Sequence, residues 1–234
     1  MNVVPAKAGT HTALPRALMC GMDSRFHGND IDLLRLLASY VKLNKVFPFT
    51  IHRSRLTRHY MAPTQPSWPD QIHRVFRDQG MRQIAYVPDT GHARLIELVR
   101  ADRQMRAIPL TTEEEGVALA VGAWLGGERS VLLLQSSGAG NCINMLGMVQ
   151  ECRVPLLMLV TMRGQWGEFN PWQVPMAQAT APALTAMGVV VQTAEHADEV
   201  AETVAAAAKL AFNTCRAVAV LIGQRVVGAK EFRK

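Results

Sequence analysis

Residues Val131 to Leu134 form an uninterrupted run of apolar side chains, without the alternation of a strand that has one solvent-exposed face. Such a run is typical of a strand that is covered on both faces in a parallel sheet. Helical and strand patterns alternate around it from residue 61 onward. They predict an α/β fold, in which one three-layer domain holds a six-stranded parallel sheet between helices.

The expected elements follow from apolar periodicity and from glycine and proline at their ends. The strands are expected at residues 82–87, 106–110, 131–134, 155–161, 189–192 and 217–222. The helices are expected at residues 68–79, 91–102, from about 113, 139–151, 182–187 and 197–212, with a long loop at residues 162–175.

Carboxylates open the helix that precedes the central strand. Thr112 and Glu115 have the spacing of a capping box, which places the start of the helix near Glu113. Acidic side chains in a first helical turn interact favourably with the helix dipole. The helix that follows is apolar or small nearly all round, so it is expected to be buried together with a carboxylate at its start. Burial favours the protonated form of a carboxyl group, which can then exchange a proton with a ligand.

The segment Q-S-S-G-A-G-N at residues 135–141 follows the central strand directly and is expected to be a glycine-rich loop. It stands at the carboxyl end of a strand, where open parallel sheets bind their ligands. A loop of this kind that leads into a helix can present N–H groups to an anion. It lacks the spacing and the lysine of a P-loop, so binding of a phosphate by this loop alone is the weaker interpretation.

The net charge of +6 lies entirely in the first 60 residues, and the acidic and basic residues of positions 61–234 balance. The balanced remainder, with no basic stripe, argues against nucleic-acid binding. No apolar run approaches the roughly 18 residues that cross a membrane. The four cysteines, at positions 20, 142, 152 and 215, lack the spacing of a zinc site and are expected to be reduced thiols of a cytoplasmic protein, with no metal site on this chain.

Residues 1–60 differ from the rest of the chain. Their segments 5–11 and 22–30 resemble translated intergenic repeats, which predicts a non-native or disordered basic extension before a natural start at Met61. A mitochondrial-type transit peptide is the alternative, because the segment contains arginine and few acids. Residues 61–234 are expected to form the domain.

Four motifs in order resemble the pyrimidine-binding domain of thiamine diphosphate enzymes, and most of all the alpha subunit of sulfopyruvate decarboxylase and the matching half of phosphonopyruvate decarboxylase. In chain order, they are V-P-D-T at 87–90, the carboxylate of Glu113 with a Gly-Ala pair nine residues later, the segment at residues 135–141 and T-M-R-G at 161–164. The resemblance spans about residues 65 to 225. Ser136, where the family has asparagine, and the W-G-E-F-N-P-W-Q loop depart from the pattern.

The resemblance implies thiamine diphosphate as the cofactor and Glu113 as the catalytic residue, hydrogen-bonded to N1′ of the aminopyrimidine so that the thiazolium C2 can lose its proton. The cofactor-binding residues it implies are Glu113, Gln135, Ser137, Gly138 and Asn141. Bonds within the loop are the alternative role for Gln135 and Asn141.

The candidate substrate-binding residues are Asp89 and Thr90, which resemble family positions on the substrate side of the cofactor, His92 in the following helix, and Arg163 at the end of a buried strand, where a guanidinium can pair with an anionic group. Each has a structural alternative: a turn before a helix for Asp89 and Thr90, the helix surface for His92, and an ion pair for Arg163. The aromatic residues Trp166, Phe169 and Trp172 are expected at a subunit contact, and Glu168 beside them is expected to be solvated.

Family members hold the diphosphate and Mg²⁺ in a second domain through a G-D-G motif, and this chain contains no G-D-G. The resemblance therefore implies a subunit that is inactive alone and forms an oligomer with a diphosphate-binding beta-type partner, which carries the Mg²⁺. The implied activity is decarboxylation of a small anionic 2-oxoacid. Sulfopyruvate, phosphonopyruvate and plain 2-oxoacids fit the motifs alike. A non-catalytic α/β binding or regulatory subunit is the alternative.

Overall fold

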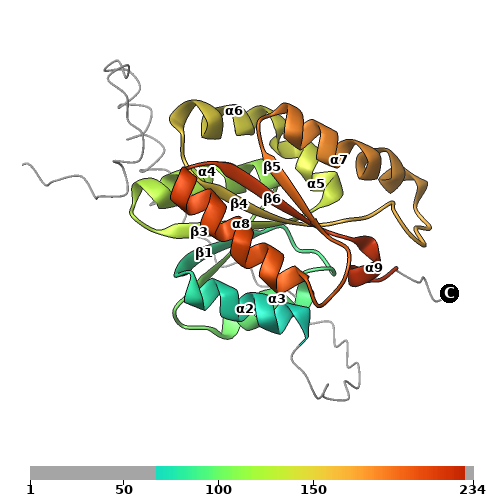
Figure 1. Cartoon of the computed structure of the whole chain (residues 1–234), viewed down its shortest axis with the longest axis horizontal. Coiled ribbons are helices and arrows are strands. Elements are labelled where there is room, and N and C mark those ends of the chain that lie inside the picture. Colours follow the sequence, from blue (N-terminus) through green and yellow to red (C-terminus); the bar gives the residue numbers. More distant parts are fainter. Residues whose placement is uncertain (1–66, 230–234) are drawn as a thin grey trace, which may run out of the picture.

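Six parallel strands form one sheet in the order β2-β1-β3-β4-β6-β5 in the computed structural model, which describes residues 67–229 (Figure 1). The strands are β1 (Met81–Tyr86), β2 (Arg106–Pro109), β3 (Arg129–Gln135), β4 (Leu156–Thr161), β5 (Val190–Ala194) and β6 (Ala217–Ile222). The predicted α/β class and the six-stranded parallel sheet are confirmed. The expectations for residues 1–60 and for a start at Met61 lie outside the described residues.

Helices cover both faces of the sheet (Figure 1). One face packs against α2 (Trp68–Asp78), α3 (Ala93–Ala101) and α8 (Val200–Thr214). The other packs against α4 (Glu113–Leu125), α6 (Ile143–Cys152) and α7 (Val174–Ala186). The shorter turns are α5 (Ser136–Ala139), η2 (Gly140–Cys142), η3 (Pro171–Gln173) and α9 (Gln224–Val227). Within residues 67–229, no helix is long and apolar enough to span a bilayer.

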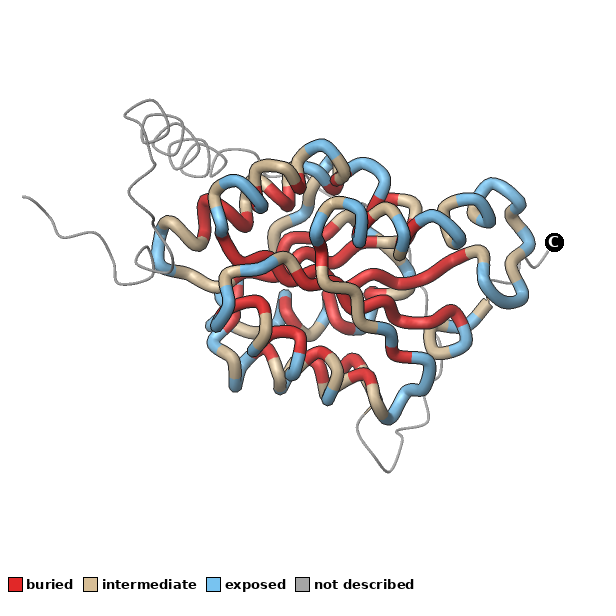
Figure 2. The backbone as a smooth tube through the Cα atoms, turned by 45° about the horizontal axis from the view of Figure 1, so that its top comes forward, coloured by how far each residue is buried: buried red, intermediate tan, exposed pale blue. Residues whose placement is uncertain are grey.

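The central strand β3 is buried on both sides, as its apolar run predicts. Val131 and Leu133 belong to the core beneath α2, α3 and α8, whereas Leu132 and Leu134 belong to the core beneath α4, α6 and α7. Figure 2 shows the buried backbone concentrated in the strands, with exposure rising toward the outer helical turns. The two cores hold the carboxyl ends of β1, β3 and β4 in fixed positions at one edge.

Two of the expected secondary-structure elements differ from those in the structure. Residues 136–142 form the turns α5 and η2 and continue into α6, so the glycine-rich segment is helical rather than a loop. Its first residue, Ser136, is fully buried and its hydroxyl accepts the Arg163 N–H at 3.1 Å. This tertiary contact helps to hold the first turn, which small residues alone do not favour.

Helix α7 was expected to begin at residue 182, but it begins at Val174 and contains Pro182 in its interior. A proline within a helix removes one backbone hydrogen bond and is usually disruptive. Thr180 and Leu184, on either side of Pro182, are fully buried. Their burial against the rest of the domain compensates for the missing bond.

Helix α4 begins at Glu113 as predicted, but the capping box is not the predicted one. Thr112 is the N-cap residue and its side chain makes no capping bond. Instead, the backbone N–H and the hydroxyl of Thr111 donate to the Glu115 carboxylate at 3.0 and 2.7 Å. The glutamate therefore binds the residue four positions before it.

Candidate active site

The side chain of Glu113 lies at the first turn of α4 and is 9% exposed. Its Oε2 accepts a hydrogen bond from Nδ2 of Asn141 at 2.7 Å. The rest of its carboxyl group lies against the α-carbon of Gly138, so closely that a β-carbon at position 138 would overlap it. The predicted residues Glu113, Gly138 and Asn141 therefore meet, although 28 positions separate Glu113 from Asn141.

Cys142 lies near enough for the Glu113 charge to act on its thiol, and it was not among the predicted site residues. Its side chain is fully buried, and its thiol donates to the Gly138 carbonyl at 3.6 Å. Burial, followed by the negative charges of Glu113 and Glu114, raises the pKa of the Cys142 thiol to about 12. The thiol is therefore neutral and not a nucleophile.

Gln135 ends β3 and is bonded on one side only. Its Oε1 accepts from the Ser137 hydroxyl at 3.3 Å, which is the loop contact considered as the alternative to cofactor binding. Its Nε2 is buried and has no acceptor among the described residues. A buried donor without an acceptor is unfavourable unless a ligand supplies one.

Asp89 follows β1 and turns back on its own segment. Its Oδ2 accepts the Gly91 N–H at 3.1 Å and the Thr161 hydroxyl at 2.8 Å. The turn considered as the structural alternative for Asp89 is thus present, and Thr90 beside it is exposed. Thr161 was not predicted as a site residue. It ends β4 opposite Gln135 of β3, and its place at the end of the strand expected at residues 155–161 could have indicated it.

His92 is fully buried, so its assignment to the helix surface is wrong. One ring nitrogen, Nε2, lies 3.1 Å from the Leu159 carbonyl, which requires the proton on that nitrogen. Burial lowers the pKa of His92, against the opposing effect of the Asp89 charge. The ring is enclosed beside Leu159 of β4 and does not face an open surface.

Arg163 follows β4 and pairs bidentately with Glu168, with Nε and one terminal nitrogen each 2.6 Å from a carboxylate oxygen. The two side chains are 8% and 4% exposed. The expected solvation of Glu168 is therefore wrong, because the segment folds back and buries the pair. The ion pair considered for Arg163 is present, and a contact of Arg163 with substrate stays a prediction.

Glu168 is the centre of a larger network. Its carboxylate also accepts from the N–H groups of Gly164 and Asn170, each at 3.1 Å, and from Nε2 of Gln224 at 3.0 Å. The bond from Arg163 is the main reason that the pKa of Glu168 is lowered to about 2. Gln224, which is 1% exposed, was missed because its partners lie more than 50 positions away.

The arrangement provides a buried carboxylate, a buried amide donor and a set of fixed backbone turns at one sheet edge. Among residues 67–229, no group of three or more histidine, cysteine, aspartate or glutamate side chains could hold a metal ion. The edge is suited to a polar ring that exchanges a proton with a carboxylate.

Known proteins resemble the chain in sequence and in fold. Residues 68–169 match the thiamine pyrophosphate enzyme family, N-terminal TPP-binding domain. Sulfopyruvate decarboxylase subunit alpha of Methanothermobacter thermautotrophicus is 32% identical over 154 residues, which cover 65% of this chain and 93% of that protein. The protein of the same name from Methanococcus maripaludis is 30% identical over 154 residues, which cover 65% and 92%.

Two further similarities are partial. Phosphonopyruvate decarboxylase of Streptomyces hygroscopicus is 38% identical over 90 residues, which cover 38% of this chain and 22% of that protein. The structure of 2-oxoglutarate:ferredoxin oxidoreductase from Magnetococcus marinus matches with a TM-score of 0.59 and 17% identity, over 69% of this chain and 29% of that one. The second similarity concerns the fold alone. Taken with the nearly full-length matches to alpha subunits, the buried glutamate and the parallel sheet around it identify the chain as a member of the thiamine pyrophosphate enzyme family that includes the sulfopyruvate decarboxylase alpha subunits.

Proposed function

We propose that the chain is the pyrimidine-side, alpha-type subunit of a thiamine diphosphate-dependent 2-oxoacid decarboxylase. Its relatives are named sulfopyruvate decarboxylase subunit alpha and phosphonopyruvate decarboxylase, which favours a small oxoacid with a second anionic group. The observation that carries the proposal is the buried carboxylate of Glu113, held by Asn141 against Gly138.

The residues present fit the pyrimidine of thiamine diphosphate. Glu113 is nearly buried, and its carboxylate can share a proton with a ring nitrogen. The buried Nε2 of Gln135 lacks an acceptor among the described residues, so a polar ligand at this edge would supply one. We infer that Glu113, Gln135 and the helical turn from Ser137 through Gly138 to Asn141 hold the cofactor ring.

When bound, the cofactor acts as the electron sink of decarboxylation. Glu113 holds or releases the proton at the pyrimidine, and Asn141 fixes the orientation of its carboxylate. The fully buried apolar residues just before the ends of β3 and β4 exclude water from beneath the site, which strengthens these interactions. Asp89 and Thr90, on the turn after β1, are proposed to approach the substrate, with Thr161 fixing Asp89.

Arg163 is proposed to bind the second anionic group of the substrate by exchanging part of its pairing with Glu168. Its guanidinium has five N–H donors, and the pair with Glu168 uses two nitrogens. His92 is proposed to support the same region from beneath and not to touch the substrate. The diphosphate and Mg²⁺ are assigned to the partner subunit. Divalent cations need a cluster of oxygen ligands, and residues 67–229 provide no cluster of carboxylates that could hold one.

Calorimetry with thiamine diphosphate and Mg²⁺ tests the proposal. The full chain is titrated alone and in a mixture with the beta-type chain of the same genome that carries a G-D-G motif. We expect binding in the mixture only. Binding in neither sample would contradict the proposal and favour a non-catalytic subunit.

The Glu113→Gln variant tests the assigned role. We expect it to join the partner normally and to lose about 10²–10⁴-fold in decarboxylation rate, which is the usual contribution of a general acid or base. Glu114→Gln is the matched control, because Glu114 stands in the same helical turn and is exposed. Full activity of the Glu113→Gln variant would exclude this mechanism.

A further inference from the structure

Exposed aromatic side chains gather on residues 163–174, which lie after β4 and include the first residue of α7. Trp166 is 46% exposed, Phe169 is 49% exposed and Trp172 is 83% exposed. Val174, at the start of α7, is 37% exposed. We call these four side chains the aromatic face.

The backbone beneath the aromatic face is held firmly. Oε1 of Gln224 accepts the N–H groups of Gln165 and Trp166 at 2.8 and 2.9 Å, and the Glu168 carboxylate accepts five hydrogen bonds in all. Gly164 has a left-handed backbone, and a β-carbon there would overlap the Gln173 carbonyl. The segment is therefore closed onto the start of α7.

This combination is unusual for a surface that faces only water. A loop that faces only water needs neither a buried ion pair beneath it nor several exposed aromatic side chains on it. A docking surface benefits from both, because a preorganised backbone loses less entropy on binding and interface hot spots are enriched in tryptophan, tyrosine and arginine. The network thus suits a face that is covered in the assembled protein.

The segment that carries the aromatic face begins at the candidate active site. The backbone N–H of Arg163 donates to the hydroxyl of Ser136 at 3.1 Å. Ser136 is the first residue of the helical stretch that brings Gly138 and Asn141 to Glu113. A protein bound on the aromatic face would therefore sit at the same end of the sheet as the candidate active site.

We propose that the aromatic face is the docking surface for the diphosphate-binding beta-type subunit. This inference rests on the proposed function, because the occupant must complete a site that lacks a metal-binding cluster within residues 67–229. A second copy of this chain would bring the same described residues and no such cluster. The guanidinium carbon of Arg225 lies 5.3 Å from the centre of the Trp166 ring, so this face combines aromatic side chains with a positive charge. The partner surface that fits it best is an apolar pocket with an acidic rim.

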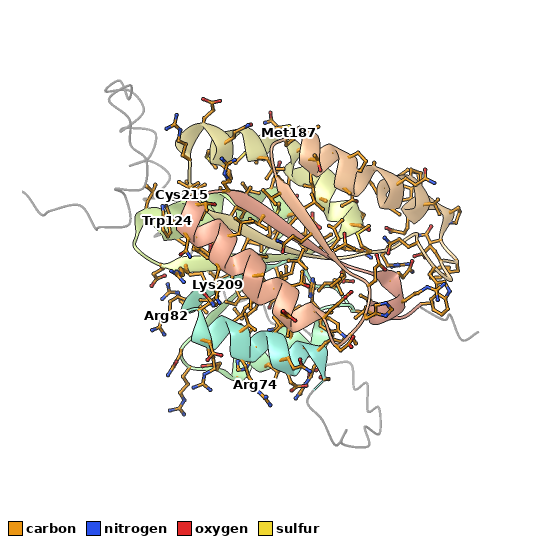
Figure 3. All side chains as sticks on the ribbon, in the orientation of Figure 1. Arg74, Arg82, Trp124, Met187, Lys209 and Cys215 are labelled. Carbon is orange, nitrogen blue, oxygen red and sulfur yellow. The ribbon has the colours of Figure 1, made fainter. Side chains whose placement is uncertain are left out.

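Sedimentation velocity tests the docking surface. The full chain is mixed with the G-D-G-bearing beta-type chain without cofactor, and the dissociation constant of the complex is measured. We expect the variant Trp166→Gln/Trp172→Gln to bind about 100-fold more weakly than wild type, as for the loss of central aromatic contacts. Arg74→Gln on α2 and Lys209→Gln on α8 are the controls. Both are exposed residues on other elements (Figure 3), and each is expected to leave the dissociation constant unchanged.

Hydrogen exchange on wild-type protein provides a test that needs no variant. Adding the beta-type chain should slow amide exchange in residues 163–174 and leave α2 unchanged. Unaltered exchange in residues 163–174, equal binding by the double variant, or no complex at all would overturn the docking surface. Self-association that the double variant abolishes would identify a second copy as the occupant instead.

The two proposals fail in different ways. Cofactor binding in a mixture whose assembly does not depend on Trp166 and Trp172 would refute the docking surface and retain the proposed function. Assembly through the aromatic face without cofactor binding would retain the docking surface and refute the enzyme.

Discussion

Nδ2 of Asn141 donates to Oε2 of Glu113 at 2.7 Å, across the junction between the first turn of α4 and the helical turn after β3. Glu113 is nearly buried whereas Asn141 is exposed, so the amide covers the carboxylate from the solvent side. The bond fixes one carboxylate oxygen and thereby the direction in which the group meets a ligand.

Two replacements of Asn141 should separate the effect of orienting the Glu113 carboxylate from the effect of a second carboxyl group beside it. Asn141→Leu removes the donor and is expected to lower the free energy of unfolding by about 1 kcal/mol, the net value of one hydrogen bond. Asn141→Asp places a second carboxyl group beside Glu113. At about pH 8 the two carboxyl groups repel each other, so the mixed complex of the aspartate variant should bind the cofactor more weakly than that of the leucine variant. Toward about pH 5 the pair of carboxyl groups shares a proton, and binding by the aspartate variant should recover. Calorimetry at both pH values measures this difference, and identical pH profiles for the two variants would contradict the contact.

Gly138 should not tolerate a methyl group. Alanine usually stabilises a helix relative to glycine by about 0.5–1 kcal/mol. At position 138 the added carbon would overlap the Glu113 carboxyl group, so Gly138→Ala is expected to lower the free energy of unfolding by about 1–3 kcal/mol. The matched control is Gly147→Ala in α6, where no atom lies within 4 Å of the new carbon and a small gain is expected. Urea unfolding measures both, and a gain at position 138 would show that Glu113 lies elsewhere.

Removal of the Gln135 amide should stabilise the fold and weaken cofactor binding. Its Nε2 is buried without an acceptor among the described residues, so Gln135→Leu is expected to raise the free energy of unfolding by about 1 kcal/mol. The same variant should bind thiamine diphosphate at least about tenfold more weakly, the effect of one lost hydrogen bond of about 1.4 kcal/mol. Thermal unfolding and calorimetry report the two quantities.

Gln83 provides the comparison for Gln135. It is 6% exposed, and its amide donates to the Glu128 carboxylate. Gln83→Leu should therefore destabilise the protein and leave cofactor binding unchanged. If both leucine variants lowered the free energy of unfolding equally, the Gln135 amide would already have an acceptor in the free protein and would not need one from a ligand.

Glu168 should determine much of the stability of residues 163–170. Glu168→Gln leaves the buried Arg163 without its counter-charge and is expected to lower the free energy of unfolding by about 3 kcal/mol at neutral pH. Glu97→Gln is the control, because Glu97 is 72% exposed beside Arg94 and should change stability by less than about 0.5 kcal/mol.

The difference between wild type and Glu168→Gln should depend on pH. Pairing with Arg163 lowers the pKa of Glu168 from 4.5 to about 2, so the folded protein keeps this carboxylate ionised where the unfolded chain protonates it. The stabilisation is full above pH 4.5 and is lost as pH falls through about 2. Urea unfolding of both proteins between neutral and acid pH measures the loss, and a constant difference would argue against the buried pair.

Local sequence rules predicted the sheet because they depend on nearest neighbours. The apolar run of β3 and the start of α4 at Glu113 appear where the patterns place them. The expected helix boundary at residue 182 failed because packing around Thr180 and Leu184 outweighs the effect of an internal proline. The expected glycine-rich loop failed for a similar reason, since Ser136 is fixed by Arg163 from the next strand.

Local patterns along the chain were enough to predict the α/β class, the parallel sheet and the carboxylate at the start of a buried helix. The folded chain set the partner of each polar group: Asn141 with Glu113, Thr161 with Asp89, and Gln224 with Glu168. It also placed His92 inside the core rather than on a surface. The outcomes differ because the interactions act over different distances along the chain. Backbone hydrogen bonding and apolar periodicity act over a few residues, whereas the partner of a buried polar side chain is set by which strand ends the folded sheet brings together.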